Sequence, residues 1–110
     1  MLFCITANYT PQALNALMDN PNTNRLEAVN KLVTAAGGKV VALYSTSSDG
    51  PGAMLIFDAD GDAASAISGV ITASGSVTNI KLSRLRSHEE VGAIRHKAAQ
   101  IRGSYKPAGQ

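Results

Sequence analysis

The stretch from Gly37 to Leu85 constrains the fold of this chain more than any other feature. Two apolar runs, residues 40–46 and 53–57, meet across the turn sequence Asp49-Gly50-Pro51-Gly52, and a helix of small residues leads to a third run. A strand pattern and a long helical pattern precede the stretch. The predicted order is therefore β-α-β-β-α-β, the split β-α-β arrangement of ferredoxin-like α+β proteins.

Capping residues and helix breakers set the limits of the first elements. A strand over residues 2–9 leads into Thr10-Pro11, which begins a helix because the hydroxyl caps free N–H groups and proline suits the first helical position. Residues 19–23, Asp-Asn-Pro-Asn-Thr, predict a kink or loop, and Gly37-Gly38 ends the resumed helix. The second helix, over residues 63–74, is expected to bury a stripe of Ala66, Ile67, Val70 and Ile71.

A third helix is predicted after the last strand, residues 77–85. Ser87 and Glu90 form a capping box, and the apolar positions that follow step by three and four: Val91, Ile94, Ala98, Ile101 and Tyr105. The chain divides into a ferredoxin-like domain over residues 1–87, a helix over residues 88–106 that packs on the domain or on a partner subunit, and a frayed tail over residues 107–110.

Size and composition fit one domain with an aliphatic core. The chain has 110 residues, 45% of them hydrophobic and 5% aromatic, so Ala, Val, Leu and Ile should fill the core. Cys4 is the only cysteine, which excludes an internal disulfide and favours a buried thiol in a reducing cytoplasm. No basic leader and no run near the roughly 20 apolar residues of a membrane span are found.

The second face of the sheet needs a cover of its own. Two helices cover only one face of a four-stranded sheet, yet residues 53–57 are almost continuously apolar, which predicts that both faces are covered. A second copy of the sheet is the simplest cover, so we expect a homodimer or a higher homo-oligomer. A partly polar cavity between the sheets would then be lined by Thr6, Asn8, Tyr44, Asn79, Lys81 and Ser83.

Several short motifs, taken in order, resemble the GYD domain family of small bacterial proteins. They are Arg25-Leu26-Glu27-Ala28, Gly37-Gly38-Lys39, the strand that ends in Tyr44, and Asp58-Ala59-Asp60-Gly61-Asp62. The likeness covers roughly residues 1–88, and Gly50-Pro51-Gly52 stands where the family has Gly-Tyr-Asp. The resemblance implies a dimeric α/β barrel, a superfamily that also holds monooxygenases, isomerases, polyketide cyclases and ligand-sensing domains. It implies no single activity.

Four side chains are the candidate ligand-binding residues: Asn8, Tyr44, Arg25 and Lys81. The Tyr44 hydroxyl and the Asn8 amide can orient a carbonyl or phenol without a charge, although Tyr44 also suits a dimer interface. Arg25 either binds an anion or pairs with Asp19. For catalysis we consider Tyr44 with His88 as a proton carrier, against the simpler interpretation of His88 as a solvated residue of a helix cap.

No metal or other cofactor is predicted. The carboxylates of Asp58, Asp60 and Asp62 imitate the opening of a calcium loop, but Gly69 stands where the bidentate glutamate is needed. The apolar seam from Val91 to Tyr105 and the absence of strong acid/base pairs favour instead a module that binds a small apolar or phenolic molecule between the sheets or serves in assembly. A cofactor-independent monooxygenase, isomerase or cyclase acting on a phenolic or carbonyl substrate is the alternative.

Charge is distributed unevenly along the chain. Residues 84–110 carry six basic and two acidic side chains, a net charge of +4, whereas the rest carries four basic and six acidic ones, a net charge of −2. A basic helix attracts nucleic acid or an acidic partner. Without aromatic platforms for stacking bases, nucleic-acid binding is the weakest of the interpretations, and a solvated helix face is preferred.

Overall fold

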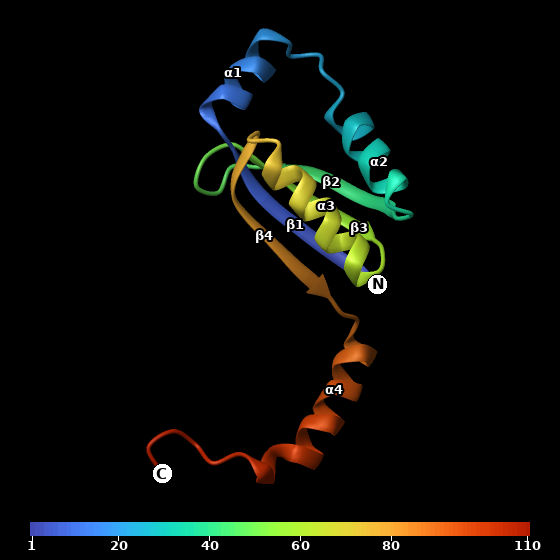
Figure 1. Ribbon diagram of the computed structural model, residues 1–110, viewed down its shortest axis with the longest axis vertical. Coiled ribbons are helices and arrows are strands. Elements are labelled where there is room, and N and C mark those ends of the chain that lie inside the picture. Colours follow the sequence, from blue (N-terminus) through green and yellow to red (C-terminus); the bar gives the residue numbers. More distant parts are fainter.

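The computed structural model describes residues 1–110 and has the predicted order of elements (Figure 1). The strands are β1 (Leu2–Tyr9), β2 (Lys39–Thr46), β3 (Gly52–Asp58) and β4 (Val77–Leu85). The helices are α1 (Pro11–Asp19), α2 (Arg25–Ala35), α3 (Gly61–Ala73) and α4 (His88–Ile101), the last followed by a 3₁₀ turn, Arg102–Ser104. The loop that the sequence predicts at residues 19–23 separates α1 from α2.

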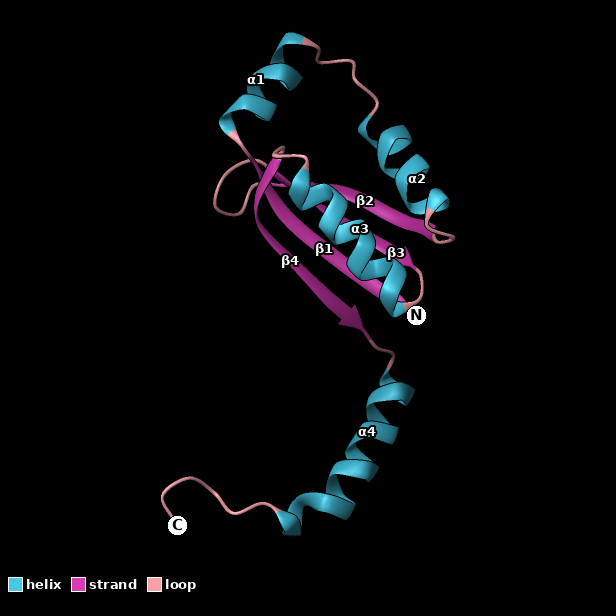
Figure 2. Cartoon of the chain, in the orientation of Figure 1, coloured by secondary structure: helices cyan, strands magenta, loops and turns pink.

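The sheet has the strand order β2-β3-β1-β4, and every neighbouring pair is antiparallel. β1 and β3 are central, because each β-α-β unit places its two strands on either side of a strand from the other unit. This topology confirms the ferredoxin-like α+β fold. Figure 2 shows the two domain helices α2 and α3 on one side of the strands.

The core lies between this side of the sheet and the two helices. Phe3 and Phe57 stack on neighbouring central strands with their ring centroids 5.8 Å apart. Val33 of α2 and Ile67 of α3 close over the sheet and are almost fully buried. The core is largely aliphatic, as the composition predicts, but the only two phenylalanines form its centre because strand pairing sets them directly opposite each other.

The buried stripe predicted for α3 is wrong in two positions. Ala66 is exposed and Val70 keeps 56% of its surface exposed, whereas Ala64 and Ile67 are buried and Ala63 and Ile71 pack beside them. Apolar side chains lie on more than one side of this helix, so periodicity alone could not choose the buried side. The smaller side, centred on Ala64, lets the helix approach the sheet closely.

The predicted caps are confirmed. The hydroxyl of Thr10 accepts a hydrogen bond from the Ala13 N–H at 3.3 Å, with Pro11 as the first residue of α1. Ser87 and Glu90 form the reciprocal capping box at the start of α4. These local contacts need no tertiary partner, which is why the sequence alone could predict them.

The other side of the sheet is bare, so the expectation that both faces are covered is not met within one chain. No helix lies on this side, which we call the open face. Met54 and Ile56 of the central strand β3 are only half-buried there, and Tyr44 of β2 keeps 59% of its surface exposed. An apolar surface of this kind indicates an interaction site.

α4 continues past the end of β4 and lies apart from the rest of the chain (Figures 1 and 2). The molecule is consequently elongated, with extents of 58 × 34 × 22 Å and a radius of gyration of 17.7 Å. A compact domain of this length has a radius of gyration of about 13 Å. None of the helices has the length and apolar character needed to cross a membrane.

Candidate functional site

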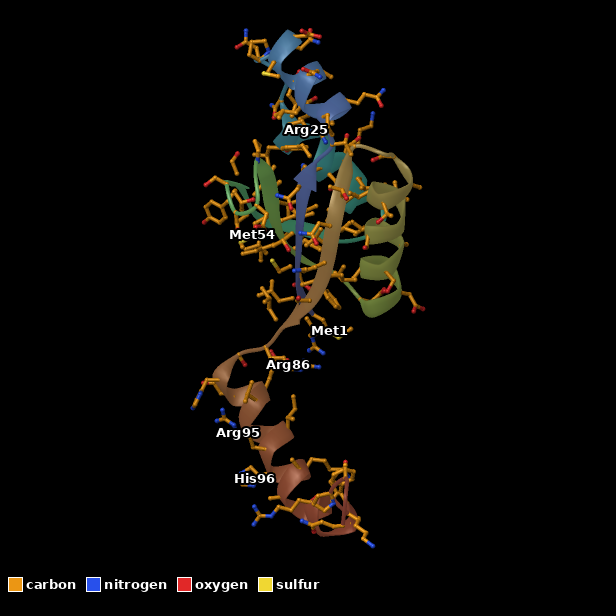
Figure 3. All side chains as sticks on the ribbon, turned by 90° about the vertical axis from the view of Figure 1, so that its left-hand side faces the viewer. Met1, Arg25, Met54, Arg86, Arg95 and His96 are labelled. Atoms are coloured by element: carbon orange, nitrogen blue, oxygen red, sulfur yellow. The ribbon has the colours of Figure 1, made fainter.

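A row of four side chains crosses the open face of the sheet. The register places Tyr44 opposite Met54, Met54 opposite Thr6, and Thr6 opposite Lys81, so one residue of each strand contributes. Directly opposite residues of antiparallel strands project to the same side. Figure 3 shows the Met54 side chain on the side of the sheet away from α3, and the whole row therefore belongs to the open face.

The polar end of this face is hollowed. The hollow has a volume of about 250 Å³ and lies where the β2–β3 hairpin loop bends beside β1 and β4. Its walls are Thr6, Ala7, Asn8, Thr46, Ser48, Asp49, Met54, Asn79 and Lys81. Most of these side chains carry hydrogen-bonding groups, and Lys81 is the only cation among them. The hollow therefore suits the polar part of a small molecule.

Asn8 holds the walls of the hollow together. Its Nδ2 donates to the carbonyl oxygens of Ser48 at 2.9 Å, Gly50 at 3.3 Å and Asp49 at 3.4 Å, and its Oδ1 accepts from Nδ2 of Asn79 at 3.2 Å. Asn79 has a φ of +54° where the pairing of β1 with β4 shifts register. Asn8 thus joins the hairpin loop to β4, and only the second lone pair of its Oδ1 is left for a ligand.

Lys81 and Tyr44 stand at opposite ends of the row. The two ion pairs of the chain are Met1 with Asp58 and Arg84 with Glu90, so Lys81 forms no close ion pair, although Asp49 also lines the hollow. Three strand spacings, about 14 Å, separate the backbones of β2 and β4, and Met54 and Thr6 lie between. A ligand along this row would meet an ammonium group at one end, an apolar floor, and a phenol at the other end.

The next row toward the end of β4 is less polar. It contains Ala42, Ile56, Cys4 and Ser83. Burial raises the pKa of the Cys4 thiol above its ordinary value. The thiol is therefore mostly protonated near pH 7, and it packs as a small apolar group.

His88 does not meet Tyr44 within one chain. β4 ends at Leu85, which pairs with Leu2, four residues or about 13 Å along the strands from the row of Tyr44. Strand spacing adds about 14 Å across the sheet, and His88 then begins α4 beyond the end of the sheet. The two catalytic candidates thus lie near opposite corners of the sheet.

Arg25 also lies outside the open-face site. It is the first residue of α2 and lines a separate pocket beneath α1, and Figure 3 labels it near α1, far from α4. The alternative partner, Asp19, forms no ion pair with it. Of the four ligand-binding candidates, the fold therefore brings Asn8, Lys81 and Tyr44 to one face and leaves Arg25 on another.

Sequence reasoning missed Met54, Thr46, Ser48 and Asp49 as parts of this site. Met54 belongs to an apolar run that indicates core on both sides. The hairpin residues reach the hollow only because the register of β1 with β3 sets Asn8 beside the loop. Strict alternation along β3 was the one signal that could have placed Met54 on the same face as Thr6.

The turn at Gly50-Pro51-Gly52 has a structural role. Gly52 is buried, and a Cβ atom at this position would collide with the carbonyl oxygen of Ala7 on the neighbouring strand. Gly50 has a φ of +104°, which favours glycine. Neither glycine contributes a group for chemistry.

Comparisons with known proteins agree with this architecture. A family model, the GYD domain, matches residues 3–94. Among solved structures, the 30S ribosomal protein S6 from Thermotoga maritima superposes with a TM-score of 0.59 at 13% identity, over 89% of this chain and 96% of that one. At this identity the likeness shows the fold alone. A comparison with curated proteins finds no significant match.

Proposed function

The chain belongs to the GYD domain family, and from this premise we propose that it is a homodimer that binds a small amphipathic molecule between the sheets of its two copies. The observation that carries the proposal is the open face itself. Its central strands present half-buried Cys4, Met54 and Ile56, and its far end is the polar hollow beside Lys81. A face that is apolar at one end and polar at the other matches an amphipathic ligand.

The exposed area supports a dimer. The chain exposes 7661 Å², whereas a compact monomer of this mass exposes about 5,800 Å². The excess is about 1,900 Å², more than twice the roughly 800 Å² that each partner contributes to an interface of standard size. The open face and α4 both carry exposed apolar side chains that a partner copy could bury. The lone thiol of Cys4 fits a protein of the reducing cytoplasm.

The groups of the row suggest the ligand class. The Lys81 ammonium donates hydrogen bonds to a carbonyl, phenolate or carboxylate oxygen, and the Tyr44 hydroxyl can donate or accept at the other end. Met54 supplies a flexible apolar floor that adapts to a ring or short chain. A small phenolic or carbonyl compound with an apolar body satisfies these groups together.

Catalysis is not part of the proposal. The proton carrier predicted from the sequence, His88, is distant from Tyr44 within the chain, and burial raises the pKa of Cys4. The groups around the hollow are suited to hydrogen bonding. We therefore assign Tyr44 and Lys81 to ligand binding.

Native mass spectrometry of the purified protein tests both halves of the proposal. We expect a dimer that carries a small molecule, which denaturation releases. Met54→Asp should abolish the dimer, since a carboxylate buried between sheets costs several kcal/mol. Ala66→Asp adds the same charge on the exposed side of α3 and should leave the dimer intact.

Lys81→Gln separates ligand binding from assembly. It should keep the dimer and lose the bound molecule, because only the cation at the hollow is removed. A dimer that survives Met54→Asp would overturn the face-to-face arrangement. A bound molecule that survives Lys81→Gln unchanged would overturn the ligand site.

A further inference from the structure

We propose a second small-molecule site, in the pocket between α1 and the end of the sheet, that binds a small ring-bearing carboxylate through Arg25. The pocket is lined by α1, the end of β1, the loop between α1 and α2, Arg25 at the start of α2, and Ser76 just before β4. It shares no residue with the open-face hollow. The proposal is therefore independent of the dimer and of the ligand proposed above.

The pocket exists because α1 packs only partly against the end of the sheet. α1 buries none of its residues fully, and among the strands its principal neighbour is β1. Ala13 and Leu17 of α1 and Tyr9 of β1 leave between them a space of about 240 Å³. An apolar cavity of about 150 Å³ already holds a benzene molecule, so this space has room for one ring and a small polar group.

The pocket lining carries positive charge and no negative charge. Arg25 is the only ionisable cation among the lining residues, and no aspartate or glutamate lines the space. The two ion pairs of the chain leave Arg25 without an acidic partner. A guanidinium group in the lining of a half-apolar pocket that contains no carboxylate is available to an anion from solution.

The chemical groups that line the pocket favour one kind of anion. A guanidinium group binds a carboxylate through two parallel hydrogen bonds, which fixes the orientation of the molecule that carries it. Leu17, Ala13 and the Tyr9 ring then offer apolar and aromatic surface to the remainder. Inorganic phosphate would leave these walls unused, and a neutral ring would leave Arg25 unused. A monocarboxylate on an aromatic ring uses both.

Benzoate is the probe for this site, with neutral benzamide as its isosteric control. Titration followed by amide chemical shifts should give saturable changes at Tyr9, Leu17 and Ser76, which lie around the pocket. Benzamide should bind at least roughly tenfold more weakly, the change expected when one charged hydrogen-bonded pair is lost. Arg25→Gln should weaken benzoate by a similar factor.

Two matched control variants, Lys31→Gln and Gln12→Leu, guard against indirect effects. Lys31→Gln removes a charge from an exposed position of the same helix and should leave benzoate binding unchanged. Ala13→Leu should fill the pocket and abolish binding, whereas Gln12→Leu, on the exposed side of α1, should not. Spectra of each variant without benzoate should show that the variant is folded.

Three results would overturn the proposal. The first is the absence of saturable shifts around the pocket. The second is benzoate affinity that is equal in the unmodified protein and in folded Arg25→Gln. The third is a set of shifts centred on Lys81, which would assign the carboxylate to the open-face hollow and leave the site under α1 without a ligand.

Discussion

At the scale of single residues, Gly52 shows how closely β3 approaches β1. A Cβ atom at this position would meet the Ala7 carbonyl oxygen, which belongs to a central strand and has little freedom to move. Gly52→Ala should therefore lower the free energy of unfolding by about 1–3 kcal/mol, the usual cost of overpacking. Urea denaturation measures the change.

Gly69 provides the matched control for that substitution. It lies within α3, and a Cβ atom there would meet nothing within 4 Å. Gly69→Ala should raise stability by roughly 0.5–1 kcal/mol, because alanine is the better helix former. Equal effects of the two substitutions would contradict the close approach at Gly52.

Cys4 reports on whether the open face is covered. Its thiol lies on this face, and burial within the single chain already raises its pKa. In the proposed dimer, alkylation by iodoacetamide should be slow and should quicken several-fold on dilution or in Met54→Asp. A rate that depends on neither concentration nor that substitution would show that the face is open in solution as well.

The residues of the site were only partly predictable. Alternation along β1 and β4 places Thr6, Asn8 and Lys81 on one face, and the register agrees. The contacts of Asn8 with the hairpin loop depend on tertiary pairing between residues 40 or more positions apart, which no local pattern records. The sequence therefore predicts which face carries polar groups, but not which of those groups are already engaged.

At the scale of elements, the start of α4 is fixed by contacts to Glu90. Its carboxylate accepts a hydrogen bond from the Ser87 N–H at 3.2 Å and pairs with Arg84 at 2.9 Å. The hydrogen bond from the Ser87 backbone, followed by the charges of Arg84 and Arg86, lowers the pKa of Glu90 below its ordinary value. The ionised form of Glu90 is thus the form that the folded cap prefers.

The sign of the pH effect follows from the lowered pKa. Glu90 contributes its full stabilisation above the ordinary glutamate pKa, about 4.3, and that contribution is lost as the pH falls through the lower folded value. Chemical shifts of the first turn of α4 should therefore report fraying below about pH 4. Glu90→Gln keeps an acceptor without a titrating charge and should remove this transition. The same acid transition in both proteins would rule out Glu90 as its cause.

The helices and strands whose ends carry capping residues, glycines or turn sequences were the ones that the sequence could predict. Caps, glycine terminators and the strand-strand turn define most boundaries closely, as the Ser87–Glu90 box illustrates. The end of α4 is the exception, because the helix stops at Ile101 and not at residue 106 as predicted. α3 was harder, since its buried side is chosen by the fit of Ala64 against the sheet and not by the count of apolar residues. Periodicity identifies a helix more reliably than it identifies the side that packs.

At the scale of the whole molecule, the isolated position of α4 is the main departure from a compact domain. Its apolar positions Val91, Ile94, Ala98 and Ile101 repeat with the three-and-four spacing of a helix–helix seam, whereas Tyr105 lies beyond the 3₁₀ turn that follows the helix. None is fully buried, and Ile94, Ile101 and Tyr105 keep 47%, 56% and 73% of their surfaces exposed. The seam lacks a partner within the chain.

Charge argues against a partner helix of the same kind. Arg95, Lys97 and Arg102 flank the seam on both sides, so two α4 helices packed together would bring like charges into contact. The rest of the chain carries the excess of acidic side chains. We therefore expect α4 to pack on the domain of a second copy and to strengthen the proposed dimer.

Removal of residues 88–110 tests this expectation. The shortened chain should dissociate at a higher concentration than the full chain in light-scattering measurements, because the apolar seam of α4 is gone. Ile94→Asp should have the same effect, while Ala93→Asp, one residue away on the outer side of the seam, should not. An oligomer that is unchanged by both the deletion and Ile94→Asp would exclude α4 from assembly. Assembly would then rest on the open face, as the Met54→Asp variant tests.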